Sequence, residues 1–159
     1  MGSISSESIQ GNINYDICEN QGNIFEKAAI EGYDMEQFSN YYMKSDFCNN
    51  HFDKRWSIYH LADTEECFEE LCSENRFRSI VTKRSGGKIC DPDTSWWIGF
   101  TYRQLNIETE VASSILSDEI PFNELCACYP GLHTVDEEYA TDLICNKHNL
   151  IKVEEREAV

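Results

Sequence analysis

The sequence predicts a mainly α protein, a single-domain helical bundle of about six helices with at most one small β-hairpin. Apolar residues recur at helical spacing through most of the chain, capping signals precede several of these stretches, and a strand-like pattern occurs only once. The 159 residues are enough to bury a core, and an aromatic content of 12% argues against global disorder. We expect residues 1–21 to be a flexible N-terminal tail, 22–150 to be the helical domain, and 151–159 to be a charged C-terminal tail.

The first two helices are expected to form a hairpin. The first runs from about residue 23 to Gly32, because glycine readily adopts the left-handed conformation that ends a helix. Asp34, followed by Gln37, resembles a capping box and predicts the start of the second helix. Residues 46–62 show no clear period, so we expect them to wrap the core as an irregular connection.

The middle of the chain predicts one amphipathic helix and the only hairpin. A helix is expected to start at Asp63 or Thr64, with its apolar residues on one face and its glutamates on the other. The segment 77–89 is a candidate two-stranded hairpin, since its apolar residues are β-formers and Ser85-Gly86-Gly87 is a turn signal.

The next helix has the strongest start signal in the sequence. Asp91 is suited to the N-cap and Pro92 to the first helical position. The stretch that follows, "SWWIGFTYRQL", is apolar over most of its surface and predicts a central helix. Gly99 lies inside it, and because glycine weakens a helix, we expect a neighbouring element to approach closely at that position.

Three further helices are expected near the C-terminus. The first covers 112–117, and the second covers 121–128 and is stopped by "YPGLHT". Thr134 with Glu137 resembles another capping box, which predicts a last amphipathic helix as far as about Lys147.

The eight cysteines are expected to be free thiols, most of them buried. The N-terminus lacks the basic and apolar regions of a signal peptide, and no apolar stretch is long enough to span a membrane, so a cytoplasmic protein is the expectation. Disulfides are rare in that compartment. Cys67 and Cys145 also lie among the apolar positions of expected helices.

The net charge of −16 is the strongest feature of the composition, and it is unevenly distributed. Residues 1–53 carry nine acids and two bases, 54–103 carry eight of each, and 104–159 carry twelve acids and three bases. Direct nucleic-acid binding is disfavoured, because it requires a positive surface. A protein partner with a basic surface is favoured, although acidity that serves only solubility remains an alternative.

No cofactor is expected, and the candidates for a metal site are weak. One Cys-x-x-His pair and one Cys-x-Cys pair together offer four zinc ligands, Cys48, His51, Cys126 and Cys128. Their spacing matches no strong zinc pattern, and neither pair is framed by a tight turn.

Three residues are weak candidates for a hydrolase-like catalytic group, Arg103, His133 and Asp136. His133 precedes an expected helix N-terminus, where the backbone N–H groups disfavour a protonated ring and leave a neutral base. The alternative is an ordinary histidine of a surface or capping loop. No known catalytic motif accompanies the three residues, so an enzyme is the less favoured class.

The aromatic helix supplies the candidate partner-binding residues Trp96, Trp97 and Arg103, to which the acids Glu137 and Glu138 are added. Adjacent tryptophans point about 100° apart on a helix, so one is expected in the core and the other either in the core or at an interface. Arg103 either pairs internally, with Asp91 or a glutamate, or stacks on a tryptophan, or faces the partner.

The motif "DPDTSWWIGFTYRQLNIET" followed by "YPGLHTVDEEYATDLI" resembles a family of small proteins from gut Firmicutes. The similarity covers roughly residues 90–146, and "YDMEQFSNYYMKSDFCNNHFD" is similar as well. Such genes lie in mobile elements beside genes for ADP-ribosyltransferase-type toxins, so the resemblance implies a toxin–antitoxin or phage-defence role. No activity carries over to individual residues.

These observations favour an acidic protein-binding inhibitor of antitoxin type, which neutralises a toxin or a component of a defence system. Two functional alternatives remain, beside a helical scaffold that binds no ligand. The first is a nucleic-acid mimic, such as an anti-CRISPR or anti-restriction inhibitor, and it requires acids on one continuous face. The second is a small enzyme that uses Arg103, His133 and Asp136, and it requires these side chains to meet in one cleft.

Overall fold

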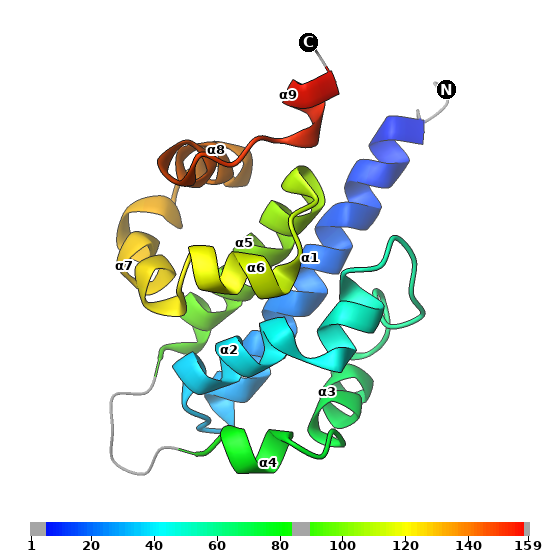
Figure 1. Cartoon of the computed structure of the whole chain (residues 1–159), viewed down its shortest axis with the longest axis vertical. Coiled ribbons are helices and arrows are strands. Elements are labelled where there is room, and N and C mark those ends of the chain that lie inside the picture. The colour runs from blue at the N-terminus through cyan, green and yellow to red at the C-terminus, as the bar shows by residue number, and fades with distance from the viewer. Residues whose placement is uncertain (1–5, 84–89, 158–159) are drawn as a thin grey trace.

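The structure is a computed structural model that describes residues 6–83 and 90–157 (Figure 1). Within these ranges the chain forms nine α-helices and one π-helix, with no strand. They are α1 (Ser6–Ile30), α2 (Met35–Lys44), the π-helix η1 (Cys48–Phe52), α3 (Thr64–Cys72), α4 (Phe77–Ile80), α5 (Pro92–Thr109), α6 (Ser113–Glu119), α7 (Phe122–Leu132), α8 (Glu137–His148) and α9 (Val153–Glu157). The mainly α fold class is confirmed, with more helices than the six expected.

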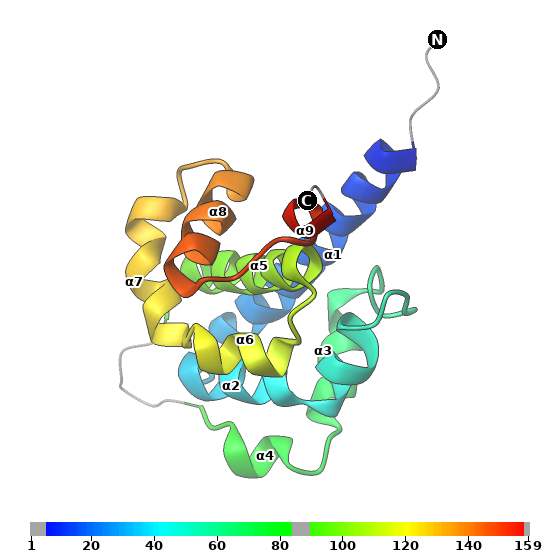
Figure 2. The same ribbon diagram turned by 45° about the horizontal axis from the view of Figure 1, so that its top comes forward.

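The helices α1 and α5 form the central pair of the bundle and lie side by side in both views (Figures 1 and 2). Two glycines permit their close approach. A Cβ atom on Gly99 would lie 2.8 Å from Cγ of Phe25, and one on Gly22 would lie 2.9 Å from the ring of Trp96. The side chain of Gln21 also donates a hydrogen bond to the carbonyl of Gly99 at 2.8 Å. The close approach expected at Gly99 is therefore confirmed, with α1 as the neighbour.

The prediction of a flexible N-terminal tail over residues 1–21 is wrong for residues 6–21, which belong to α1. The side chains of α1 become buried from Ile17 onward, and two of the buried ones, Asn20 and Gln21, are polar. Their amides are satisfied by tertiary hydrogen bonds; Asn20, for example, donates to the carbonyls of Tyr59, His60 and Ala62 at 3.0–3.2 Å. Because some of the buried positions of this stretch are polar, the sequence shows no apolar period there. Residues 1–5 lie outside the described part of the chain.

An aromatic cluster packs α2, α3 and α4 against α1. Its centre is Phe38 on α2, which is fully buried and stacks on Phe68 of α3 with ring centroids 6.1 Å apart. The edges of Phe25 on α1 and Phe77 on α4 meet the same ring. Such offset and edge-to-face contacts are the arrangements that aromatic quadrupoles favour.

Aspartates cap the helices at three of the predicted starts. The carboxylates of Asp34, Asp63 and Asp91 accept hydrogen bonds from backbone N–H groups in the first turns of α2, α3 and α5. The box predicted with Gln37 is only half formed, because the side chain of Gln37 accepts hydrogen bonds from Thr82 instead.

The β-hairpin expected over residues 77–89 is wrong where the structure describes it. Residues 77–80 form the short helix α4, and Phe77 is buried in the aromatic cluster. The only β-type contact in the described ranges is an isolated bridge between Tyr33 and Lys83. The turn Ser85-Gly86-Gly87 lies outside the described residues.

Two boundaries in the C-terminal half also differ from the prediction. The helix α7 does not stop at Cys128 but continues through Pro130 to Leu132. Pro130 lies in the last turn, and because proline has no N–H, the helix loses there the backbone hydrogen bond to the carbonyl four residues earlier. The cap of α8 is Asp136 rather than Thr134. Its carboxylate accepts hydrogen bonds from the backbone N–H groups of Glu138 and Tyr139.

The charged tail expected from residue 151 is wrong for its described part. Lys152 is 2% exposed and pairs with Glu108 at 3.1 Å and Asp142 at 2.5 Å. Beyond it, residues 153–157 form α9, and Arg156 donates to the carbonyl of Thr109 on α5 at 2.9 Å. Ion pairs and hydrogen bonds therefore attach the C-terminal end to the bundle.

Candidate functional site

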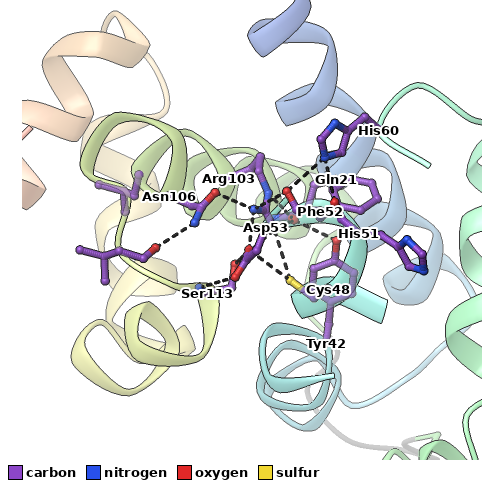
Figure 3. A network of polar contacts seen from close by, with 12 residues as sticks. Gln21, Tyr42, Cys48, His51, Phe52, Asp53, His60, Arg103, Asn106 and Ser113 are labelled. Carbon is purple, nitrogen blue, oxygen red and sulfur yellow. Dashed lines mark hydrogen bonds and ion pairs between the residues drawn. The ribbon is translucent and has the colours of Figure 1, made fainter. Parts of the chain in front are cut away.

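Arg103 lies at the centre of a polar network inside the bundle (Figure 3). Its side chain is fully buried, and Nη1 donates to a carboxylate oxygen of Asp53 at 2.7 Å. The remaining N–H groups donate to Gln21, Cys48, Phe52, Asn106 and Ser113 at 2.7–3.2 Å. The guanidinium also lies over the ring of Phe52, 5.5 Å from its centroid. The network joins α1, η1, α5 and α6 through one side chain.

The charge of this network is a single ion pair. Burial disfavours a charged Arg103, but the surrounding groups, Cys48, Tyr42 and Asp53, outweigh it and raise the pKa of the guanidinium. Burial raises the pKa of the Cys48 thiol to about 11, although Arg103 opposes the rise, so the thiol is neutral at pH 7. Asp53 is 13% exposed at its side chain and supplies the negative charge. A neutral, fully buried thiol is a poor nucleophile, and the network is structural.

The prediction that Arg103 faces a partner is therefore wrong, because no part of its side chain reaches the surface. The internal pairing that we considered is present, but with Asp53 instead of Asp91 or a glutamate. Asp53 precedes Arg103 by fifty residues, and sequence spacing gave no sign of the contact.

The three candidate catalytic residues do not form a group. The ring of His133 is exposed, stacks on Tyr129 at 4.2 Å and shares a hydrogen bond with the carbonyl of the same residue. Asp136 is exposed and caps α8. Among the described residues, no hydrogen bond or ion pair joins either of them to Arg103, which is buried against Asp53.

The two tryptophans have different environments, as their angular separation on the helix predicts. Trp97 is 7% exposed and meets the edge of Tyr129, so it is a core residue. Trp96 is half-buried, stacks on Phe100 at 5.1 Å and donates a hydrogen bond from Nε1 to Asn23. Trp97 is therefore not available to a partner, and most of Trp96 is occupied by contacts between α1 and α5.

The four candidate metal ligands are not assembled. Cys48 accepts from Arg103 at 3.2 Å, and His51 contacts Ser57 and the ring of Tyr59. A hydrogen bond between Cys126 and Cys90 lowers the pKa of Cys90. Within the ranges that the structure describes, no group of three or more His, Cys, Asp or Glu side chains is placed to hold a metal ion. All eight cysteines are free, as expected, and four of them, including Cys67 and Cys145, are buried.

A pocket of about 390 Å³ opens between α1, α5 and the start of α8. Its walls include the rings of Tyr15 and Phe100, whose centroids are 5.2 Å apart, and four acids, Glu108, Asp136, Glu137 and Glu138. No lining residue is basic. We call it the acidic pocket. The predicted partner-binding residues Glu137 and Glu138 thus flank a cavity, and Asp136 lies beside them.

Three of the more exposed large apolar side chains of the described residues were missed by the sequence analysis. Trp56, Ile58 and Leu61 are 77%, 68% and 59% exposed and follow one another in the segment between η1 and α3. The sequence signal for these exposed side chains was the missing apolar period in residues 46–62. Apolar side chains that do not recur at a regular period cannot all face the core. Two exposed bases, Lys54 and Arg55, directly precede Trp56, so this segment is not suited to the same basic surface as the acidic pocket.

The chain has no match among protein-family models, curated proteins or solved structures. Within the described residues, no helix is both long enough and apolar enough to cross a membrane.

Proposed function

We propose that this protein is a non-enzymatic acidic inhibitor of antitoxin type, which binds and neutralises a protein partner with a basic surface. The observation that carries the proposal is that several bases form ion pairs with acids of the same chain, whereas many acids are exposed. The chain has 29 acids and 13 bases, and several of the bases are neutralised by acids of the same chain. Arg103 and Lys152 are buried in ion pairs, and Lys27, Lys44 and Lys147 pair with carboxylates at the surface.

Many acids, by contrast, are left exposed. Glu66 and Glu69 on α3, and Glu137 and Glu138 on α8, are exposed and form no ion pair with the described residues. Unpaired surface carboxylates attract a basic partner over distances of about one Debye length, roughly 8 Å at physiological salt. They raise the association rate and exclude acidic competitors. The family resemblance adds a class of partner, a toxin or a nucleic-acid-processing protein.

The two alternative functions receive less support. A nucleic-acid mimic requires acids along one face, but α3 and α8 lie on opposite sides of the central helices α1 and α5 in both views (Figures 1 and 2). An enzyme that uses Arg103, His133 and Asp136 requires one cleft, but Arg103 is buried in its own network. The positions of the acids therefore do not favour a nucleic-acid mimic, and the burial of Arg103 does not favour the enzyme.

Co-purification with the product of the neighbouring gene tests the proposal. We expect a complex at low salt that weakens steeply as salt is raised. The variant Glu137→Gln/Glu138→Gln should weaken the complex more than the matched variant Glu66→Gln/Glu69→Gln, which removes the same charge from α3. If the two proteins do not associate at low salt, or if the complex does not respond to salt, the proposal is wrong.

A further inference from the structure

We propose that the acidic pocket binds an arginine side chain of the partner. This inference rests on the proposed function, because it identifies which chemical group of the basic surface enters the protein. It starts from a comparison within the molecule, between the buried site of Arg103 and the acidic pocket.

The site of Arg103 shows which groups surround a guanidinium in this fold. Among them are an aromatic ring (Phe52), a carboxylate (Asp53), a carboxamide (Gln21) and a thiol (Cys48), and the hydroxyl of Ser113 and the carbonyl of Phe52 accept further hydrogen bonds. Each group has a separate physical role. The ring face attracts the planar cation, the carboxylate neutralises it, and the amide and thiol accept its remaining N–H groups.

The acidic pocket offers the same four kinds of group, and no base among its lining residues occupies it. Phe100 and Tyr15 supply aromatic rings, Glu137 and Glu138 supply carboxylates, and the neutral acceptors are a carboxamide and a thiol. These two are Gln104 and Cys18. A cationic side chain that enters the pocket therefore meets the kinds of group that already hold Arg103.

The groups of the pocket are available to a ligand. The thiol of Cys18 lines the pocket and is 3% exposed, and burial raises its pKa to about 12, so it is neutral at pH 7. Gln104 donates its amide hydrogen to Glu108 at 3.2 Å, which leaves its carbonyl oxygen as an acceptor. Glu137 and Glu138 are exposed and without an ion pair in the described ranges. Only Glu108 is already neutralised, by Lys152 at 3.1 Å.

The local field favours a cation. The pKa of the Tyr15 phenol is raised, first by partial burial and then by the carboxylates of Glu137 and Glu19, which disfavour a further negative charge. The same carboxylates stabilise a positive charge at that position.

Arginine fits this pocket better than lysine. Its planar guanidinium stacks on a ring and donates two parallel hydrogen bonds to one carboxylate, whereas the ammonium of lysine is a compact, strongly hydrated charge. The volume of about 390 Å³ holds one long side chain together with part of its backbone.

The test is a titration of the full chain with N-acetyl-arginine amide, followed by amide chemical shifts in NMR spectra. We expect saturable shifts at Tyr15, Gln104 and Glu137, with a dissociation constant on the order of 1 mM. N-acetyl-citrulline amide, which has the same shape without the charge, should produce no saturable shift. N-acetyl-lysine amide should bind several-fold more weakly than the arginine compound.

The variant Glu137→Gln/Glu138→Gln should weaken arginine binding about tenfold, and Glu66→Gln/Glu69→Gln should leave it unchanged. All four positions are exposed, so both variants keep the fold, which near-UV circular dichroism verifies. Equal shifts from citrulline, shifts spread over α3, or no effect of the α8 variant would overturn the proposal. Because the titration needs no partner protein, a failure to co-purify with the neighbouring gene product would contradict the proposed function without affecting this result.

Discussion

Arg103 on α5 pairs with Asp53, which follows η1, at 2.7 Å, and their side chains are 0% and 13% exposed. Asp53 is itself held in place, because it accepts hydrogen bonds from both the backbone N–H and the hydroxyl of Ser113 at the start of α6. The pair therefore joins α5, α6 and the end of η1, and Gln21 extends it to α1. A contact of this kind stabilises one arrangement of the helices over its alternatives.

Replacement of Arg103 by methionine should lower the free energy of unfolding by about 3–5 kcal/mol, because it leaves Asp53 partly buried without its counter-ion. Chemical denaturation followed by circular dichroism measures the loss. The matched control is Lys44→Met, which breaks the exposed pair between Lys44 and Asp118 and should cost less than about 1 kcal/mol. Equal losses in the two variants would mean that the buried network contributes no more than a surface ion pair.

The sequence predicted the elements whose signals are local. Asp63 and Asp91 indicate the starts of their helices because their side chains are N-caps. The stretch after Asp91 is apolar enough to predict a central helix. The N-terminal half of α1 could not be predicted, because its buried amides Asn20 and Gln21 are satisfied by residues more than twenty positions away in the sequence. Polar groups in a core are visible in the sequence only as gaps in the apolar period.

The candidate site divides in the same way. Glu137 and Glu138 were predicted from charge, and they do line a pocket. Arg103 was selected as the one base on an aromatic helix, and it proved to be buried against Asp53, a partner fifty residues away that follows η1. Tyr15 was missed because it lies in the region that was expected to be a tail. Pockets depend on which helices meet, and that information is tertiary.

Two glycine substitutions should have opposite effects, because Gly99 lies in the contact between α1 and α5 and Gly131 lies in open space on α7. Gly99→Ala should cost about 1–3 kcal/mol, because the new Cβ would lie 2.8 Å from Phe25 and 2.9 Å from the carbonyl oxygen of Gln21. Gly131→Ala in α7 should stabilise the protein by up to about 1 kcal/mol, since no atom lies within 4 Å and alanine is the better helix former. Thermal unfolding of both variants checks the signs, and a stabilising Gly99→Ala would show that the helices separate without cost.

The tryptophans should differ sharply in their contribution to stability. Trp97→Ala should cost about 3–5 kcal/mol, because it removes a buried ring that packs against Tyr129. Trp56→Ala should change the free energy of unfolding by less than about 0.5 kcal/mol, since Trp56 is 77% exposed. Urea denaturation measures both values. A large loss from Trp56→Ala would mean that its segment packs on the bundle.

Stability should fall at alkaline pH, and Cys67 contributes to the fall. Burial raises the pKa of its thiol from 9.0 to about 11 in the folded protein. The unfolded chain therefore releases this proton first as the pH rises above 9.0, which favours unfolding. The contribution of the thiol is fully present below pH 9.0 and is lost as the pH approaches 11.

The variant Cys67→Ala isolates this contribution. Its free energy of unfolding should depend on pH less steeply than that of the unmodified protein between pH 9 and 11, while the two proteins differ by a constant amount between pH 6 and 8. Equal slopes in the alkaline window would show that Cys67 does not titrate differently in the folded state.

Lys152 links the stability of the C-terminal end to the charge of the acidic pocket. It is buried between Glu108 and Asp142, and Glu108 is one of the acids that line the pocket. Lys152→Met should lower the free energy of unfolding by about 2–4 kcal/mol, because two carboxylates lose their counter-ion. The same change frees Glu108 for a ligand, so N-acetyl-arginine amide should bind several-fold more tightly. Lys147→Met, which breaks only an exposed contact with Glu124, should affect neither quantity by much. A stability loss without a gain in arginine affinity would mean that Glu108 does not reach the ligand, and the binding carboxylates would then be those of α8 alone.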